Sequence, residues 1–191
     1  LAINIKDRGH HAKISTAFDG NLADSTCVFC GQCIMVCPVG ALTSKVSAGK
    51  GKPYQTEKVV TTCTYCGTGC TLALNVKGDK VVGVTSVRDI EKSPVNNGAL
   101  CVKGRFGWDF INSDERLTTP LIRENGELRQ ASWDEALDYT ASRLKGIKEK
   151  HGADSIAMFT SARVTNEENY LAQKFTRAVL GTNNVDHCAR L

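Results

Sequence analysis

The chain has 191 residues, of which 41% are apolar and nine are cysteine, and its formal net charge is +4. Basic and acidic residues are interspersed without a basic run, which argues against a nucleic-acid-binding protein. No apolar stretch approaches the roughly 18 residues that a membrane span requires, so we expect no transmembrane segment.

The first predicted unit, residues 1–48, has a polar lead and then a compact cysteine motif. Four cysteines and a proline follow C-x2-C-x2-C-x3-C-P spacing: Cys27, Cys30, Cys33, Cys37 and Pro38. This is the spacing of bacterial-ferredoxin [4Fe–4S] sites, and Gly31 lets the backbone curl so that N–H groups point at the sulfurs. Zinc is an alternative, although zinc sites usually come as two separated pairs. Disulfides are disfavoured because the cysteines are too close together to join distant segments.

In such modules the fourth cysteine binds the neighbouring cluster. The spacing therefore predicts that Cys27, Cys30 and Cys33 hold one cluster, and that Cys37 belongs to a second. No cysteine precedes Cys27, so we expect the remaining ligands, and the N-terminal half of the module, to lie outside these 191 residues.

A linker is predicted over residues 49–58, in a stretch rich in Lys, Gly and Ser. The next unit, residues 59–115, contains a C-x2-C-x3-C triad and one distant cysteine: Cys63, Cys66, Cys70 and Cys101. A compact triad with a later fourth thiolate makes a complete [4Fe–4S] site. Between them, the alternation of Leu72, Leu74 and Val76 predicts a hairpin with strands over residues 71–76 and 81–85.

The last unit, residues 116–191, changes to an α/β pattern. A capping box at Ser132 and Glu135 opens a predicted helix with apolar residues at helical spacing, and Gly152 ends it. A buried strand is predicted over residues 155–160.

A second capping box, at Thr165 and Glu168, opens a helix that is expected to run to about Leu180 and to end at Gly181. Strand, loop and capped helix form half of a doubly wound unit. We expect its second strand and closing layer to be absent from the chain.

In combination, these motifs resemble the N-terminal part of the catalytic subunit of molybdenum- or tungsten-dependent formate dehydrogenases, members of the molybdopterin oxidoreductases. The resemblance extends from Asp19 onward and rests on the cysteine triad and on these segments: Cys101–Trp108, Arg116–Arg123, Trp133–Leu137, Ser161–Tyr170 and Gly181–Arg190. The resulting fold class is mixed α+β and α/β. It comprises a ferredoxin-like [4Fe–4S] module, a small β-rich [4Fe–4S] domain and the incomplete start of an α/β pterin-binding domain.

The resemblance also implies roles for single residues. Lys103, two residues after Cys101, takes the place of a lysine implicated in electron transfer between cluster and pterin. Arg163, Asn166 and Asn184 are candidate ligands of the pterin guanine dinucleotide, and the alternative for Arg163 is an ordinary helix-surface role. His187 and Cys188 are interpreted as packing residues beside the active-site loop rather than as a metal pair.

In the family, a Cys or selenocysteine that binds the metal follows a His-Cys-Ala-Arg-x stretch, and this chain stops at Leu191, one residue short. The resemblance implies [4Fe–4S] clusters, a Mo- or W-bis(molybdopterin guanine dinucleotide) cofactor and interconversion of formate and CO2. It implies as partners the remainder of the same subunit, iron–sulfur subunits, ferredoxin, and NAD(P)-reducing or hydrogenase subunits.

A reducing, anaerobic cytoplasm is expected because open thiolate clusters oxidise readily. Two alternatives stay open: another molybdopterin oxidoreductase or complex I-like large subunit, and a non-catalytic electron-transfer module.

Overall fold

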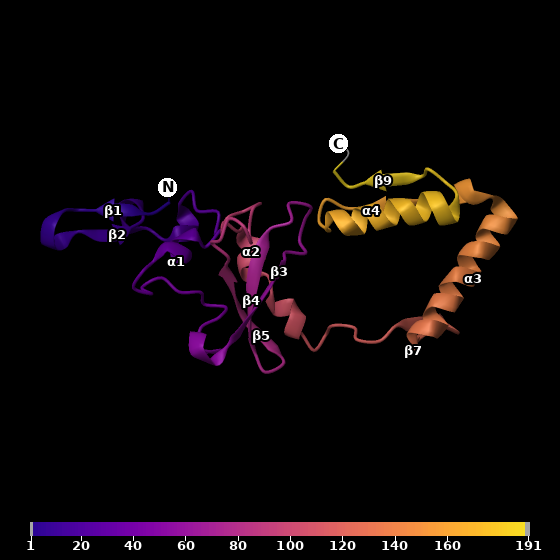
Figure 1. Ribbon diagram of the computed structural model, residues 1–191, viewed down its shortest axis with the longest axis horizontal. Coiled ribbons are helices and arrows are strands. Elements are labelled where there is room, and N and C mark those ends of the chain that lie inside the picture. Colours follow the sequence, from indigo (N-terminus) through magenta and orange to yellow (C-terminus); the bar gives the residue numbers. More distant parts are fainter. Residues whose placement is uncertain (1, 190–191) are drawn as a thin grey trace. The chain divides into compact units, whose positions relative to one another are not determined.

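The computed structural model describes residues 2–189 and divides into two compact units (Figure 1). The first unit comprises the residues up to Thr61 together with Thr71–Asp109, and the second comprises Thr62–Cys70 together with the residues from Phe110 onward. The chain therefore passes from the first unit into the second, back, and into the second again. This division follows contacts within the structure and does not test the domain boundaries predicted from the sequence. Residues 59–115 therefore stay a predicted domain.

The first unit opens with a β-hairpin that the sequence did not predict. Strands β1 (Asn4–Lys6) and β2 (Lys13–Ser15) pair antiparallel, with Asn4 opposite Ser15. Helix α1 (Gln32–Val36) lies within the first cysteine motif. It begins after Gly31, whose φ of 68° is in the left-handed region that glycine adopts most easily. This turn fits the expectation that Gly31 lets the backbone curl.

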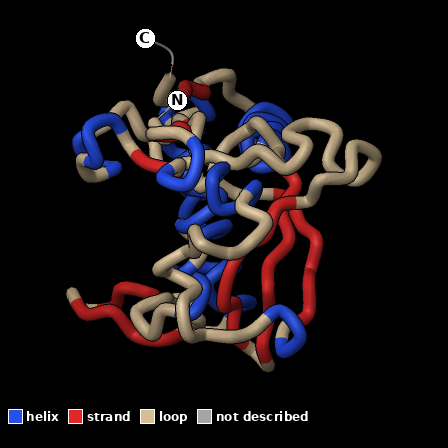
Figure 2. The backbone as a smooth tube through the Cα atoms, turned by 90° about the vertical axis from the view of Figure 1, so that its left-hand side faces the viewer, coloured by secondary structure: helices blue, strands red, loops and turns tan. Residues whose placement is uncertain are grey.

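A three-stranded sheet with the order β3-β4-β5 follows, and its strands are drawn red in Figure 2. It consists of β3 (Glu57–Thr62), β4 (Thr71–Lys77) and β5 (Lys80–Ser86). The antiparallel pairing of β4 with β5 confirms the predicted hairpin. Strand β3 was not predicted, and its six residues are all exposed.

The predicted alternation along β4 is only partly seen, because Ala73 is buried as well as Leu72. A register shift between Asn75 and Val76 interrupts the period of two. Helix α2 (Val102–Phe106) follows the sheet and begins directly after Cys101, its N-cap residue.

The second unit contains the hairpin of β6 (Leu121–Glu124) and β7 (Glu127–Gln130), then helix α3 (Trp133–His151). Ser132 Oγ accepts a hydrogen bond from Glu135 N at 3.1 Å, which confirms the predicted helix start. The Glu135 carboxylate, however, pairs with Arg129 at 2.6 Å, so half of the predicted capping box is used for an ion pair. Gly152, with φ 82°, ends the helix as predicted.

Strand β8 (Met158–Thr160), helix α4 (Asn166–Phe175) and strand β9 (Val185–His187) form a β-α-β unit (Figure 1). The two strands are parallel, with Met158 opposite Val185. The expectation that no second strand lies in this chain is therefore wrong. Strand β9 is only three residues long, too short to show a hydrophobic period, and the strand predicted over residues 155–160 is likewise reduced to three residues.

The helical segment that begins with α4 ends at Leu180, as predicted from the sequence. Thr165 and Glu168 form the complete capping box, and Gly181, with φ 83°, closes the helical segment. Between them the last turn, Thr176–Leu180, is a π-helix.

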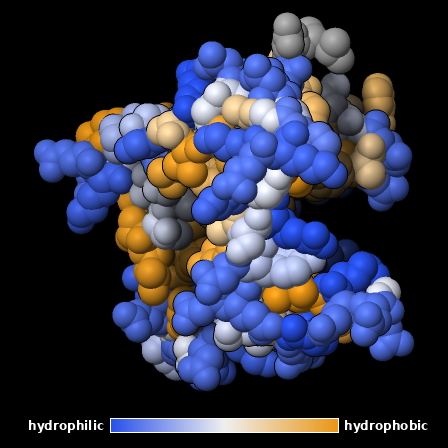
Figure 3. Space-filling model, turned by 90° about the vertical axis from the view of Figure 1, so that its right-hand side faces the viewer, coloured by the Kyte–Doolittle hydropathy of each residue, from blue (hydrophilic) through white to orange (hydrophobic). Residues whose placement is uncertain are grey.

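Large apolar side chains remain at the surface of both units. Figure 3 shows orange, hydrophobic patches on one face. On α3 the predicted apolar stripe is largely open, with Trp133 67% and Leu137 60% exposed. The expectation of a mixed helix and sheet composition is confirmed. Within residues 2–189, none of the helices combines the length and apolar composition that a bilayer crossing requires.

Candidate iron–sulfur and pterin sites

The first cysteine loop presents four thiols that are half-buried and not joined in disulfides: Cys27, Cys30, Cys33 and Cys37. Phe29 N donates to Cys27 Sγ at 3.4 Å. Ser25 Oγ in turn accepts a hydrogen bond from Cys27 N at 3.2 Å and fixes the entry to the loop. These contacts shape the loop around its sulfur atoms.

The Cys37 thiol lies just beyond the end of α1, among the backbone N–H groups that follow Pro38. Hydrogen bonds from the N–H groups of Leu42 and Val39, followed by those of Ala41 and Gly40, hold the pKa of Cys37 below its ordinary value. Such a ring of amide dipoles stabilises a negatively charged sulfur. The expectation that backbone N–H groups point at the sulfurs is therefore confirmed at this position and at Cys27.

Arg105, in α2, contacts both the first cysteine loop and strand β5, all within the first unit. Only 5% of the residue is exposed. Its guanidinium donates three hydrogen bonds: Nε to the Cys30 carbonyl at 3.3 Å, Nη1 to Ser86 Oγ at 2.8 Å and Nη2 to Gln32 Oε1 at 3.4 Å.

Gly31 completes this contact, because a Cβ at its position would lie 2.9 Å from Arg105 Cγ and 2.8 Å from Phe106 Cζ. Glycine is therefore required at residue 31 both for its left-handed φ and for the close approach of α2.

Two more residues singled out by the sequence lie at the start of α2: Cys101 is its N-cap, and Lys103 is in its first turn. Cys101 is exposed, and its carbonyl accepts from Arg105 N at 3.0 Å. Lys103 is also exposed, and its backbone carbonyl accepts from Gly107 N at 2.8 Å. The Lys103 side chain thus remains at the surface of the first unit.

In the second unit, the Cys63–Cys70 loop is closed by its own backbone and by α4. Cys63 N donates to the Cys70 carbonyl at 2.8 Å. Asn166 Nδ2 donates to the Gly67 carbonyl at 2.8 Å, and a Cβ on Gly67 would overlap Asn166 Oδ1. The amide of Asn166, a candidate pterin ligand, therefore also positions the cysteine loop.

The remaining candidates lie at the carboxyl ends of β8 and β9. Cys188 Sγ accepts from Ala162 N at 3.3 Å and lies 3.4 Å from Ser161 Oγ. Ser161, then Ala162 and the charge of Arg163, lower the pKa of the Cys188 thiol. The Arg163 side chain itself is exposed, two residues before the Thr165 N-cap of α4.

Two further candidates, Asn184 at the amino end of β9 and His187 at its carboxyl end, have local partners. Asn184 Nδ2 donates to the Asp154 carbonyl at 3.0 Å, which holds the start of β9 in place. His187 Nδ1 accepts a hydrogen bond from Ala189 N at 3.1 Å, so this ring nitrogen already has a partner two residues along the chain. Arg190 and Leu191, at the end of the family stretch, lie outside the described residues.

Across residues 2–189, no three Cys, His, Asp or Glu side chains converge closely enough to hold one metal ion. A [4Fe–4S] cube offers four separate iron corners, so thiolates spread around a loop suit it better than thiolates meeting at a point. The N–H groups around Cys37 and the buried Arg105 cation complement an anionic cluster. The first loop therefore fits the [4Fe–4S] group.

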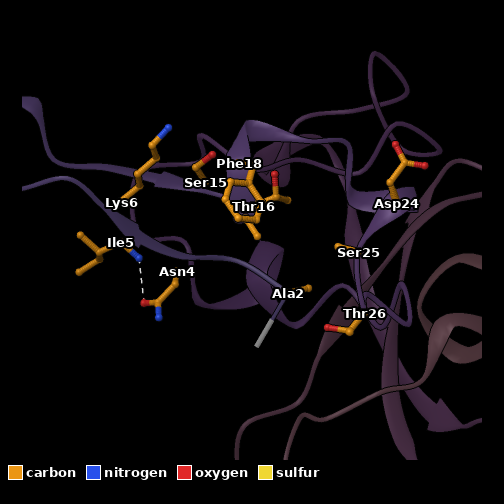
Figure 4. Close-up of a pocket in the computed structure, with 11 residues that line it drawn as sticks. Ala2, Asn4, Ile5, Lys6, Ser15, Thr16, Phe18, Asp24, Ser25 and Thr26 are labelled. Carbon is orange, nitrogen blue, oxygen red and sulfur yellow. Dashed lines mark hydrogen bonds between the residues drawn. The ribbon is translucent and has the colours of Figure 1, made fainter.

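An open hollow borders the N-terminal hairpin in the first unit (Figure 4). Its lining includes Ala2, Phe18, Asp24 and Thr26, and none of the predicted ligands. We therefore assign no part of the cofactor chemistry to it.

Three family models match consecutive parts of the chain. Residues 24–43 match the 4Fe-4S binding domain, residues 56–113 the molybdopterin oxidoreductase Fe4S4 domain, and residues 116–191 the molybdopterin oxidoreductase family. The fold and cysteine loops thus define an iron–sulfur electron-transfer protein. More specifically, residues 56–113 and 116–191 both match the molybdopterin oxidoreductases, and the three matches together support [4Fe–4S] clusters and molybdopterin as the cofactors.

Similar full-length proteins are found in Staphylococcus aureus. Proteins named "Putative formate dehydrogenase" from strains USA300 and N315 are 39% and 38% identical to the chain over 218 aligned residues. Each alignment takes in 94% of this chain and 22% of the relative. The chain therefore spans about a fifth of the length of these relatives.

Arg105 is the residue of this region that motif reasoning missed. The resemblance drew attention to Lys103, two positions earlier, because that lysine has a place in the family motif. The contact between Arg105 and Cys30 joins residues 75 positions apart, and spacing within a motif gives no sign of it.

Proposed function

We propose that the chain is the electron-transfer part of a formate dehydrogenase catalytic subunit. The observation that carries the proposal is the order of three matched segments, a ferredoxin-type site, a molybdopterin-type Fe4S4 domain and a molybdopterin domain. The formate specificity is supported by the names of the relatives. The metal–pterin group would supply the two-electron oxidation of formate to CO2 or its reverse.

Eight cysteines are proposed as cluster ligands. Three hold the first cluster, one contributes to its ferredoxin-type neighbour, and the matched Fe4S4 segment contains the other four: Cys27, Cys30 and Cys33; Cys37; Cys63, Cys66, Cys70 and Cys101. This assignment rests on motif spacing and on the family matches. The same matches support a ferredoxin-like module, a β-rich cluster domain and an α/β pterin domain.

Lys103 is proposed to assist electron transfer between the pterin and the cluster that includes Cys101. Its exposed ammonium group, two residues from that ligand, can place a positive charge beside an anionic cofactor. Arg163 is proposed to bind the pterin dinucleotide phosphates through its exposed guanidinium before the start of α4. Asn166 and Asn184 are weaker proposals, because both amides already have partners within the chain.

A reducing, anaerobic cytoplasm suits exposed thiolate clusters. The proposed electron partners are iron–sulfur subunits, ferredoxin, or NAD(P)-reducing or hydrogenase subunits. The proposal includes either molybdenum or tungsten as the metal. It also includes either cysteine or selenocysteine as the metal ligand.

The proposal is tested on the anaerobically purified full-length protein. We expect Mo or W with [4Fe–4S] clusters, and formate-dependent reduction of a viologen dye. Metal-loaded protein that does not oxidise formate would reject the formate assignment in favour of another molybdopterin oxidoreductase. Clusters without Mo, W or pterin would favour a complex I-like subunit or a non-catalytic electron-transfer module.

The role of Lys103 is tested with Lys103→Gln, which keeps a polar side chain, shorter by one atom, but removes its charge. We expect slower formate-dependent dye reduction at unchanged iron content. Lys80→Gln, at the exposed start of β5, is the matched control. Equal rates in the two variants would refute the role of Lys103.

A further inference from the structure

Arg105 combines deep burial with a charge that lacks an anionic partner. The residue is 5% exposed, and its three side-chain hydrogen bonds all go to neutral groups: the Cys30 carbonyl, Ser86 Oγ and Gln32 Oε1. None of the ion pairs found among residues 2–189 includes Arg105. A buried cation without a counter-charge is costly, so the arrangement points to an anion that binds beside it.

The surroundings of the guanidinium identify that anion. Burial lowers the pKa of Arg105, while the thiols of Cys30 and Cys33 act in the opposite direction and raise it. Arginine nevertheless keeps its charge in proteins. Two of its hydrogen bonds, to the Cys30 carbonyl and to Gln32 Oε1, place the guanidinium against the first cysteine motif. A cluster held by that motif would therefore carry the missing counter-charge.

The same residue is also connected to the ligand that precedes α2. Arg105 N donates to the Cys101 carbonyl at 3.0 Å, while Arg105 Nε donates to the Cys30 carbonyl at 3.3 Å. One proposed ligand of each of two clusters is therefore bonded, through its carbonyl, to a single residue. Gly31 allows this close approach, since any Cβ there would meet Arg105 Cγ.

We propose that Arg105 is a fixed positive charge that raises the reduction potential of the cluster held by Cys27, Cys30 and Cys33. Reduction adds one electron to the cluster, breaks no bond and increases its negative charge. A guanidinium in a low-dielectric setting stabilises the reduced form more than the oxidised form. Arg105 would thereby favour electron flow onto this cluster. It is a positioning and charge-tuning residue and not an electron carrier.

The inference depends on the cluster assignment within the proposed function, and not on formate as the substrate. Its test is a redox titration of the full-length protein with dithionite and mediators, followed by electron paramagnetic resonance. The signal of the first cluster is identified as the one that is lost in Cys33→Ser. Iron and acid-labile sulfide are measured for every variant.

Two substitutions of Arg105 separate charge from shape. Arg105→Gln removes the charge, and we expect at least a tenfold loss in the equilibrium constant for reduction, a shift of about 59 mV to lower potential for one electron. Arg105→Lys keeps the charge but loses the guanidinium fork, and its potential should remain near that of the unmodified protein. Arg8→Gln removes an exposed arginine from the β1–β2 hairpin turn and should shift nothing.

Gln32→Glu provides an independent variant that leaves Arg105 in place. The new carboxylate would lie at the position of Gln32 Oε1, 3.4 Å from Arg105 Nη2, and neutralise its charge. We expect the first cluster to shift to lower potential at full iron content. If Arg105→Gln fails to assemble the cluster, an unshifted potential in Gln32→Glu still overturns the role of Arg105.

Three results would overturn the role of Arg105. They are an unshifted potential in iron-replete Arg105→Gln, an unshifted potential in Gln32→Glu, and equal shifts in Arg105→Gln and Arg105→Lys. Protein without iron or sulfide would instead refute the cluster assignment itself. Absence of formate oxidation would leave the titration and its outcome intact.

Discussion

Replacing Gly31 with alanine tests whether the first cysteine loop packs against α2 as the structure shows. The left-handed φ of 68° costs a residue with a Cβ about 1–2 kcal/mol. The new methyl group would also lie 2.8 Å from Phe106 Cζ and 2.9 Å from Arg105 Cγ. Arg105 is held by three side-chain hydrogen bonds and cannot move without breaking them. Such overpacking costs about 1–3 kcal/mol, so the expected total is roughly 2–5 kcal/mol.

Gly49→Ala supplies the matched control. Gly49 has a similar φ of 76°, but a Cβ there would meet nothing within 4 Å. The backbone cost and the effect of alanine on the unfolded chain are therefore shared by the two variants. Their difference isolates the crowding against Arg105 and Phe106, about 1–3 kcal/mol, and every 1.4 kcal/mol or so is a factor of ten in an equilibrium constant.

The assay is the urea dependence of loss of the first cluster, followed under anaerobic conditions by its paramagnetic signal in the full-length protein. Cluster release makes a two-state free energy inappropriate, so the urea midpoints of the two variants are compared directly. We expect Gly31→Ala to lose its cluster at clearly lower urea than Gly49→Ala. Equal midpoints would refute the packing of the loop on α2.

Three further predictions concern the second unit. Thr165→Ala removes the N-cap of α4, a loss of about 1 kcal/mol, and should lower the urea midpoint of the helical signal in circular dichroism; an unchanged midpoint would contradict the cap. Because the pKa of Cys188 is lowered, a larger thiolate fraction should react with iodoacetamide at neutral pH, and Ser161→Ala should raise the pH at which alkylation reaches half its maximal rate. A pH profile that does not move in Ser161→Ala would exclude this hydrogen bond. Gly67→Ala should displace Asn166 and reduce the iron bound by the Cys63–Cys70 loop, as an iron assay would show; full iron content would argue against the contact.

Features encoded by neighbouring residues were predictable from the sequence. The cysteine spacings, the curl of the backbone at Gly31, the helix start at Ser132 and the capping box at Thr165 depend on residues a few positions apart, and the structure confirms the local geometry of the last three. The hairpin of β4 and β5 was also predictable, because a short turn separates two β-rich segments.

Features encoded by distant residues were not predictable in the same way. Strand β9 becomes a strand because it pairs with β8, about 27 positions earlier, and three residues carry no period of their own. The Arg105 contact with the first cysteine loop depends on how the chain folds back after the sheet. The Glu135 carboxylate does not complete the capping box because it forms an ion pair with Arg129, on the preceding strand β7.

The most direct test of the account is quantification of iron and acid-labile sulfide in the anaerobically purified full-length protein, combined with its paramagnetic spectrum before and after formate is added. We predict several [4Fe–4S] clusters per chain, with reduced-cluster signals that appear on addition of formate. Protein that contains neither iron nor labile sulfide, and shows no signal after dithionite reduction, would contradict the claim that these cysteine loops conduct electrons.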